Sequence, residues 1–310
     1  MATANPLQHP TPAHQLSLPE NVAQTHPVEV IDSTFIPRGD VDITLNYSKL
    51  PEDGSIPFSY VEEPPAGQPR SNLSELLVTV RVRDIRGHES EFNLDKDAFA
   101  VVSNIPESVE RDFVDDDSIR KKYYPEVEKL ILDNVPGSNR VFLFDHTIRR
   151  SNSDAKRAPV QRVHIDQTHK SATQRVHTHL PEEAETLLKG RCRIINIWRP
   201  LNGPVQASPL AFASGSTLSD EDAVGVEHRY PDRTGETAAV RYNEGQKWHY
   251  LSGMRNDERI FLECFDSEAT KPGTKVLGGK VPHTAFKDPR TPAGATGRES
   301  IEVRALVFGP

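Results

Sequence analysis

Apolar and polar residues alternate along several short stretches of the chain, which is the pattern of β-strands with one buried face. Residues 40–47 (DVDITLNY) and 76–83 (LLVTVRVR) show it in the N-terminal half. Residues 90–94 follow the second stretch across an Arg-Gly-His turn, so we expect these two stretches to form a hairpin. Further runs of strand length occur at 140–144, 163–166, 192–198, 238–242, 247–251, 260–265 and 301–308. The pattern predicts a mainly β domain.

Two segments have a helical pattern instead. Residues 115–133 begin with acids and continue with apolar residues at helical spacing, and residues 181–190 begin with proline and acids and end with Lys-Gly. The histidines before the second helix, His169, His177 and His179, are expected in a polar loop. Because strands dominate and no parallel βαβ rhythm occurs, we expect an antiparallel jelly roll of the cupin kind, a double-stranded β-helix, with the helices packed outside it.

The first 30 residues differ in composition from the rest of the chain. They contain five prolines among His, Gln and Thr residues, which is too many for a helix and too polar for a central strand. We therefore expect residues 1–30 to form a flexible, proline-rich arm and residues 31–310 to form one domain. A chain of 310 residues is long enough to bury a sizeable core.

Charge and composition exclude several classes of protein. The chain has 37 basic and 45 acidic residues, a formal net charge of −8, which argues against binding nucleic acid by phosphate neutralisation. No apolar run reaches membrane-spanning length, and no secretory signal pattern stands at the N-terminus. The two cysteines suit a reducing compartment. We expect a cytoplasmic protein that acts on a small molecule; the sequence does not predict its oligomeric state.

The sequence His164-Ile165-Asp166 is the strongest candidate for chemistry. On a strand, His164 and Asp166 point to the same face and offer neighbouring nitrogen and oxygen ligands. One further histidine from a remote strand would complete the two-histidine, one-carboxylate triad that binds Fe(II) and leaves positions open for reaction. His283 and His249 are the two alternatives for that ligand, and we favour His283 because a basic residue, Arg298, follows it near the start of the next strand.

Arg298 has the position at which 2-oxoglutarate enzymes of this architecture bind the far carboxylate of the co-substrate. A guanidinium binds a carboxylate through two parallel hydrogen bonds, which suits this role. Arg304, in the following strand, is the alternative for the same role or for binding a substrate carboxylate.

Several segments together resemble one known family. They are 144–150 (FDHTIRR), 163–167 (VHIDQ), 195–201 (INIWRPL), 203–206 (GPVQ), 264–267 (CFDS), 282–286 (PHTAF) and 298–308 (RESIEVRALVF). Over about residues 40 to 308 the chain resembles the fungal hydroxylase/desaturase family typified by AsaB, which is similar to gibberellin desaturase-like proteins and to CmcJ of cephamycin biosynthesis. The resemblance implies an Fe(II)- and 2-oxoglutarate-dependent oxygenase that uses O2 to hydroxylate, desaturate or cyclise a secondary metabolite or modified amino acid.

The resemblance also implies roles for single residues. It assigns iron to His164, Asp166 and His283, and 2-oxoglutarate to Arg298, with Arg304 in reserve. Residues expected to line the substrate pocket are Trp198, Arg199, Arg149 and Tyr123. For Trp198 and Arg199 the alternative is structural: a core position for the tryptophan and an ion pair with an acid for the arginine.

Overall fold

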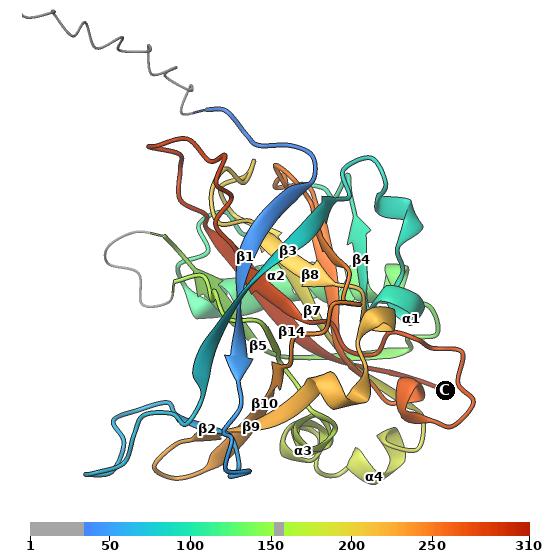
Figure 1. Ribbon diagram of the computed structural model, residues 1–310. Helices are drawn as coiled ribbons and strands as arrows, with labels where there is room; N and C mark the ends of the chain where they lie inside the picture. Colours follow the sequence, from blue (N-terminus) through green and yellow to red (C-terminus); the bar gives the residue numbers. More distant parts are fainter. Residues whose placement is uncertain (1–33, 152–157) are drawn as a thin grey trace, which may run out of the picture. The chain divides into compact units, whose positions relative to one another are not determined.

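The computed structural model describes residues 34–151 and 158–310 (Figure 1). Residues 1–30 lie outside the described residues, so the division of the chain into an arm and one domain stays a prediction. Within the described ranges, no helix is long and apolar enough to cross a membrane.

Most of the described chain is built from two β-sheets. The larger sheet has the strand order β1 (Val41–Lys49), β3 (Ser74–Asp84), β11 (Trp248–Tyr250), β8 (Leu210–Ala213), β13 (His283–Ala285), β6 (His164–Ile165), β10 (Thr234–Val240), β9 (Ala223–Arg229), β2 (Phe58–Tyr60). The smaller sheet has the order β4 (Phe99–Val102), β12 (Arg259–Asp266), β7 (Arg191–Pro200), β14 (Ser300–Gly309), β5 (Arg140–Arg149). All pairings are antiparallel except β3 with β11 and β2 with β9. This is the predicted jelly roll.

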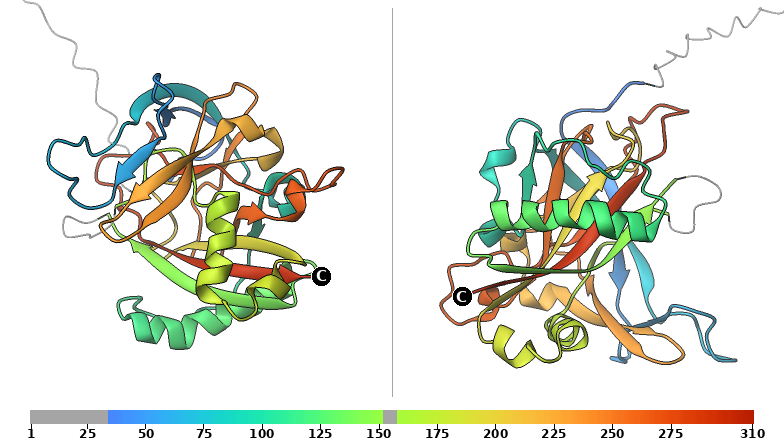
Figure 2. Two further views of the ribbon diagram at one scale, coloured as in Figure 1. Left: turned by 90° about the horizontal axis from the view of Figure 1, so that it is seen from below. Right: turned by 180° about the vertical axis from the view of Figure 1, so that it is seen from behind.

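Helices are few in the described residues, and only α2 is long. The α-helices are α1 (Leu94–Asp97), α2 (Asp116–Asn134), α3 (His169–His179) and α4 (Ala184–Leu187). Single 3-10 turns are η1 (Glu89–Glu91), η2 (Gly215–Thr217), η3 (Asp220–Asp222) and η4 (Glu268–Thr270). The long helix α2 lies across the outer face of the smaller sheet, as Figure 2 shows from behind (green helix).

Strand alternation divides the smaller sheet between two apolar clusters. On β7, Ile194 and Trp198 belong to the cluster between the sheets, whereas Ile195 and Ile197 belong to the cluster under α2. Both faces of this strand are therefore buried, which explains why residues 192–198 read as a nearly continuous apolar run.

The structure confirms most predicted elements and corrects three. Strands lie at or near 40–47, 76–83, 192–198, 260–265 and 301–308, and α2 occupies the first predicted helix. The hairpin to residues 90–94 was wrong: the Asn93 side chain accepts a hydrogen bond from the Lys96 backbone, which begins α1, and β3 pairs with β1 and β11 instead.

The second correction concerns the histidines before the second helix. They lie in helix α3 rather than in a polar loop. The Thr168 and Ser171 side chains each accept a hydrogen bond from the other residue's backbone N–H, which forms a capping box at the start of this helix. The second predicted helix is reduced to the single turn α4.

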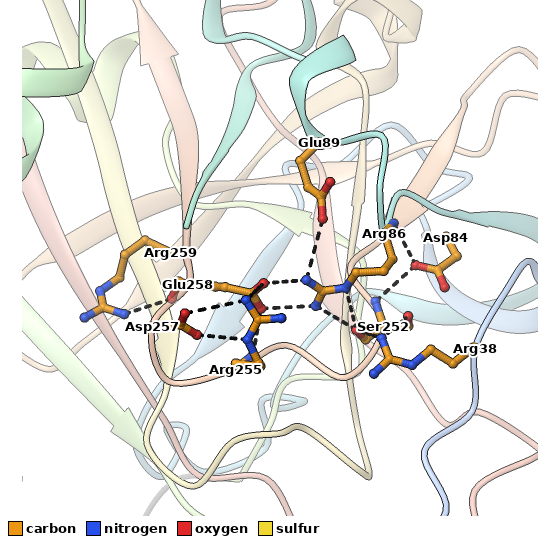
Figure 3. A network of polar contacts seen from close by, with 9 residues as sticks. All are labelled: Arg38, Asp84, Arg86, Glu89, Ser252, Arg255, Asp257, Glu258 and Arg259. Atoms are coloured by element: carbon orange, nitrogen blue, oxygen red, sulfur yellow. Dashed lines mark hydrogen bonds and ion pairs between the residues drawn. The ribbon is translucent and has the colours of Figure 1, made fainter. Parts of the chain in front are cut away.

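A buried ion-pair network ties the connection between β11 and β12 to the end of β3 (Figure 3). Glu258 is fully buried, forms a bidentate contact with Arg86 and accepts a hydrogen bond from the Arg255 backbone at 2.7 Å. Arg86 and Arg38 both donate to the Ser252 carbonyl, at 2.8 and 3.0 Å. The network holds this connection against the N-terminal strands.

Candidate metal centre

Three ligand side chains meet at the inner face of the larger sheet. His164 in β6 and His283 in β13 stand directly opposite each other in the two paired strands, and Asp166 follows His164 by two residues. Asp166 Oδ1 lies 3.4 Å from His164 Nε2 and 3.9 Å from His283 Nε2. The three ligand atoms all lie within 4.8 Å of one another, a spacing that suits one metal ion.

Backbone carbonyls orient both imidazole rings. His164 Nδ1 lies 2.8 Å from the carbonyl oxygen of Arg162, and His283 Nδ1 lies 3.1 Å from that of Val281. A carbonyl only accepts, so each Nδ1 carries the proton and donates it. In the neutral ring each Nε2 then keeps its lone pair for a metal, which is the arrangement that metal-binding histidines have in proteins.

The far oxygen of Asp166 is held by two donors. Asp166 Oδ2 accepts hydrogen bonds from Asn196 Nδ2 at 2.8 Å and Arg304 Nε at 3.2 Å, which leaves Oδ1 toward the histidines. Burial acts to raise the pKa of Asp166, but the charge of Arg304 and the two histidines outweigh it and hold that pKa well below its usual range. Asp166 is therefore anionic, as a carboxylate ligand of a metal has to be.

The guanidinium of Arg304 contacts several acidic side chains beside the three candidate ligands. Besides Asp166, its guanidinium contacts Glu302 Oε1 at 2.7 Å and Asp145 Oδ1 at 3.0 Å. Glu302 and Arg304 share one face of β14, as the strand period requires. Arg304 thus has acidic partners on several sides.

Arg298 lies in a small cavity that also reaches the three ligands. The lining residues are Arg149, Val160, His164, Asp166, Trp198, Leu210, His283, Thr284, Ala285, Arg298 and Glu302. Arg298 is 2% exposed, its Nη1 donates to the Ser208 carbonyl at 2.7 Å, and its guanidinium lies 5.2 Å from the centre of the Trp198 ring. Its Nε is buried and has no hydrogen-bond partner among the described residues.

The electrostatics of this cavity favour an anion. Burial, and then the nearby charge of Arg149, lower the pKa of Arg298 to about 9, so the buried charge is poorly compensated. A buried cation with a free donor gains from a carboxylate that enters the cavity. The donor set fits Fe(II), which is bound by two histidines and one carboxylate with open positions, and Arg298 fits one end of a dicarboxylate that reaches the same metal.

The other predicted pocket residues divide between the two sides of the smaller sheet. Trp198 and Arg149 line the cavity. Arg199 points to the opposite face, where its guanidinium lies 5.3 Å from the Phe113 ring and 5.8 Å from the Tyr123 ring. Adjacent residues of a strand face opposite ways, so Arg199 faces α2, which carries Tyr123, and neither residue is brought to the metal ligands.

His249, the rival third ligand, lies two strands away from His283. Both residues stand opposite Phe212 of β8, one from each side, and two strand spacings amount to about 9.5 Å. His249 is buried against the rings of Phe92 and Phe99, at 4.8 and 5.6 Å between centroids. It does not belong to the group of ligands within metal-binding distance.

Sequence reasoning missed the residues that hold Asp166. Asn196 interrupts the apolar run of β7, and that lone polar residue on an inward position was the available signal. The role of Arg304 had no such signal, because its partners come from β5, β14 and the segment after β6.

Comparisons with known proteins show which family the chain resembles. Residues 45–308 match the family described as "Oxidoreductase/YMDC permease-like domain". The chain is 37% identical over 299 residues to hydroxylase/desaturase poxK of Penicillium oxalicum, with 88% of this chain and 92% of that protein covered. It is 34% identical over 257 residues to the Fe(II)/2-oxoglutarate-dependent dioxygenase nvfI of Aspergillus novofumigatus, with 81% and 90% covered.

A solved structure of an iron and alpha-ketoglutarate-dependent endoperoxidase, NvfI, matches with a TM-score of 0.80 at 30% identity, over 88% of this chain and 99% of that chain. The family match spans nearly the whole described fold and includes all three candidate ligands. The chain therefore belongs to the fungal hydroxylase/desaturase family of Fe(II)- and 2-oxoglutarate-dependent oxygenases.

Proposed function

We propose that the chain uses Fe(II), 2-oxoglutarate and O2 to hydroxylate, desaturate or oxidatively cyclise a small secondary metabolite or modified amino acid. His164, Asp166 and His283 hold the iron, and Arg298 binds the far carboxylate of 2-oxoglutarate. One observation carries the proposal: an anion-binding guanidinium without a partner on its Nε shares one small cavity with a two-histidine, one-carboxylate cluster.

The residues of the chain have separate tasks in this proposal. His164 and His283 offer Nε2 lone pairs because their Nδ1 protons are bound to backbone carbonyls. When bound, Fe(II) and 2-oxoglutarate would activate O2, which supplies the oxidising power that removes hydrogen from an unactivated carbon.

Arg298 gives the co-substrate one orientation, because its buried guanidinium is held between the Ser208 carbonyl and the Trp198 ring. Trp198 is 3% exposed, and its ring shields one side of the Arg298 guanidinium from water. Asn196 and Arg304 keep Asp166 Oδ1 directed toward the histidines through their hydrogen bonds to Oδ2. Positioning by rigid neighbours is the protein's main contribution in such a site.

Anaerobic titration with Fe(II) and then 2-oxoglutarate tests the proposal. We expect the weak visible charge-transfer band of the iron chelate to form in the wild-type protein and to be lost in His164→Ala and Asp166→Ala. Iron bound without any band on addition of 2-oxoglutarate would favour the rival functions, a metal-binding protein without turnover or an enzyme that does not use 2-oxoglutarate.

A pair of arginine variants sharpens the same titration. Arg298→Gln should still bind iron but need far more 2-oxoglutarate, since losing a buried charged partner costs about 2 to 5 kcal/mol. Arg199→Gln is the matched control, because Arg199 is also buried but faces Tyr123 of α2. An unchanged 2-oxoglutarate requirement in Arg298→Gln would show that Arg298 does not bind the far carboxylate of 2-oxoglutarate.

We also propose a cytoplasmic location. Its support is that both cysteines, Cys192 and Cys264, are buried free thiols, as expected in a reducing compartment. Fluorescence imaging of the full chain fused to a reporter checks it, and an organellar or extracellular signal would contradict it.

A further inference from the structure

A second, larger cavity reaches Asp166 from the side of α3 and the β9–β10 hairpin. Its volume is about 390 Å³, which is within the range of cavities that hold small molecules. The helix contributes Ser171, Gln174, Arg175 and Thr178, which share one helical face. The hairpin and its strands contribute His228, Tyr230, Arg233, Thr234, Gly235, Glu236 and Thr237. Arg298 is not part of this lining.

The charges in this cavity are unequally compensated. Glu236 contacts Lys170 at 3.1 Å, and Arg233 contacts Asp232 at 3.3 Å. Arg175 has no carboxylate within ion-pair distance in the described part of the chain, and its guanidinium lies 5.3 Å from the centre of the Phe144 ring. Arg175 is therefore the cation of this cavity that is open to an incoming anion.

An apolar cavity adjoins the larger one and shares two lining residues with it. It has a volume of about 240 Å³ and reaches His164. Its lining is mostly apolar, with Leu73, Val160, Val163, Val226, Ala238 and Ala239, and it also includes Ser48, Ser59 and Arg162. The two cavities share His228 and Thr237, whose side chains are hydrogen-bonded at 2.8 Å. The metal ligands thus border a polar, cationic space through Asp166 and an apolar space through His164.

We propose that these two cavities hold the oxidisable substrate, and that it is an amphipathic organic acid. Arg175 binds its carboxylate or an equivalent anionic oxygen group, and its apolar body lies along Val226 and Ala239 beside His164. The inference rests on the proposed function, because only a site of oxidation beside the metal needs a substrate there. The co-substrate occupies the separate Arg298 cavity, so the two anions do not compete for one guanidinium.

Binding of a matched pair of probes tests this assignment without turnover. The protein is loaded with Zn(II), which has no redox chemistry, and with excess 2-oxoglutarate, which fills the Arg298 cavity. Naphthylacetate and naphthylacetamide, which differ in charge, are then titrated by their fluorescence. We expect the wild-type protein to bind the acid at least about tenfold more tightly than the amide, as a charge-assisted contact provides.

Three variants test which side chain causes the tighter binding of the acid. Arg175→Gln should bind acid and amide equally, whereas Arg233→Gln, whose arginine already has an acidic partner, should keep most of the preference. Val226→Asn should weaken both probes alike. Equal affinities in the wild-type protein, no binding of either probe, or an acid preference that persists in Arg175→Gln would each overturn the assignment. A protein that never forms the 2-oxoglutarate chelate refutes the proposed function instead, so the two failures are distinguishable.

Discussion

Arg304 holds the carboxylate of Asp166 from behind: Arg304 Nε lies 3.2 Å from Asp166 Oδ2, while Asp166 Oδ1 faces His164 Nε2 at 3.4 Å. The same guanidinium contacts Glu302 and Asp145. A side chain with this many fixed partners orients a ligand rather than receiving a mobile co-substrate. The geometry favours Arg298 over Arg304 as the residue that binds 2-oxoglutarate.

Replacing Arg304 with Met should therefore weaken metal binding more than co-substrate binding. Losing a residue that orients a ligand commonly lowers metal affinity about 10- to 100-fold, and the 2-oxoglutarate requirement at saturating iron should change little. Metal titration of purified Arg304→Met and Arg304→Lys measures the effect, and lysine should restore part of the affinity. A variant with normal iron affinity but a raised 2-oxoglutarate requirement would show that Arg304, and not Arg298, binds 2-oxoglutarate.

Replacing His283 and His249 one at a time tests which of the two histidines is the third metal ligand. His283→Ala should lose iron and all succinate formation, because it removes one of the three ligands within 4.8 Å of one another. His249→Leu should keep iron, since His249 lies beyond Phe212 and packs among aromatic rings. Metal analysis of both variants decides the matter: iron retained by the first and lost by the second reverses the assignment.

His249 should make the folded protein sensitive to acid. Burial lowers the pKa of His249 to about 4 from an ordinary value of 6.5. The unfolded chain therefore binds a proton that the folded protein does not between these two pH values, and the free energy of unfolding falls as the pH falls through this window. At pH 5 the loss from this residue is about 2 kcal/mol.

Urea denaturation of metal-free wild-type protein and His249→Leu at pH 7 and pH 5 measures this contribution. The variant should lose about 2 kcal/mol less than the wild type between the two pH values. Equal losses in both proteins would show that His249 has an ordinary pKa.

The network of Figure 3 should matter for stability rather than for chemistry. Glu258→Ala removes a fully buried carboxylate and leaves the charge of Arg86 without its bidentate partner, a change that costs about 3 to 5 kcal/mol. Asp257→Ala is the control, because the Asp257 side chain is 38% exposed and its ion pair with Arg255 lies at the surface. Thermal unfolding of the two variants checks this, and equal destabilisation would contradict it.

Local periodicity was sufficient for much of the fold. Strand alternation predicted that His164 and Asp166 share a face, and helical spacing predicted α2, because both depend on residues a few positions apart. The predicted hairpin after β3 was wrong because it was inferred from neighbouring residues alone, whereas the pairing of β3 involves distant ones. Asn93 caps a helical turn, and the true partners of β3 are β1 and β11, the second of which lies more than 160 residues away.

The sequence by itself determined which residue types carry the chemistry, which of them share a face of their own strand, and that the chain resembles an oxygenase family. Only the tertiary structure decided that His283 rather than His249 stands opposite His164, that Arg304 meets Asp166, and that Arg175 borders the same centre. These relations depend on strand order and register between distant segments. Register is set by burial of whole strand faces, and no short stretch of sequence contains that information.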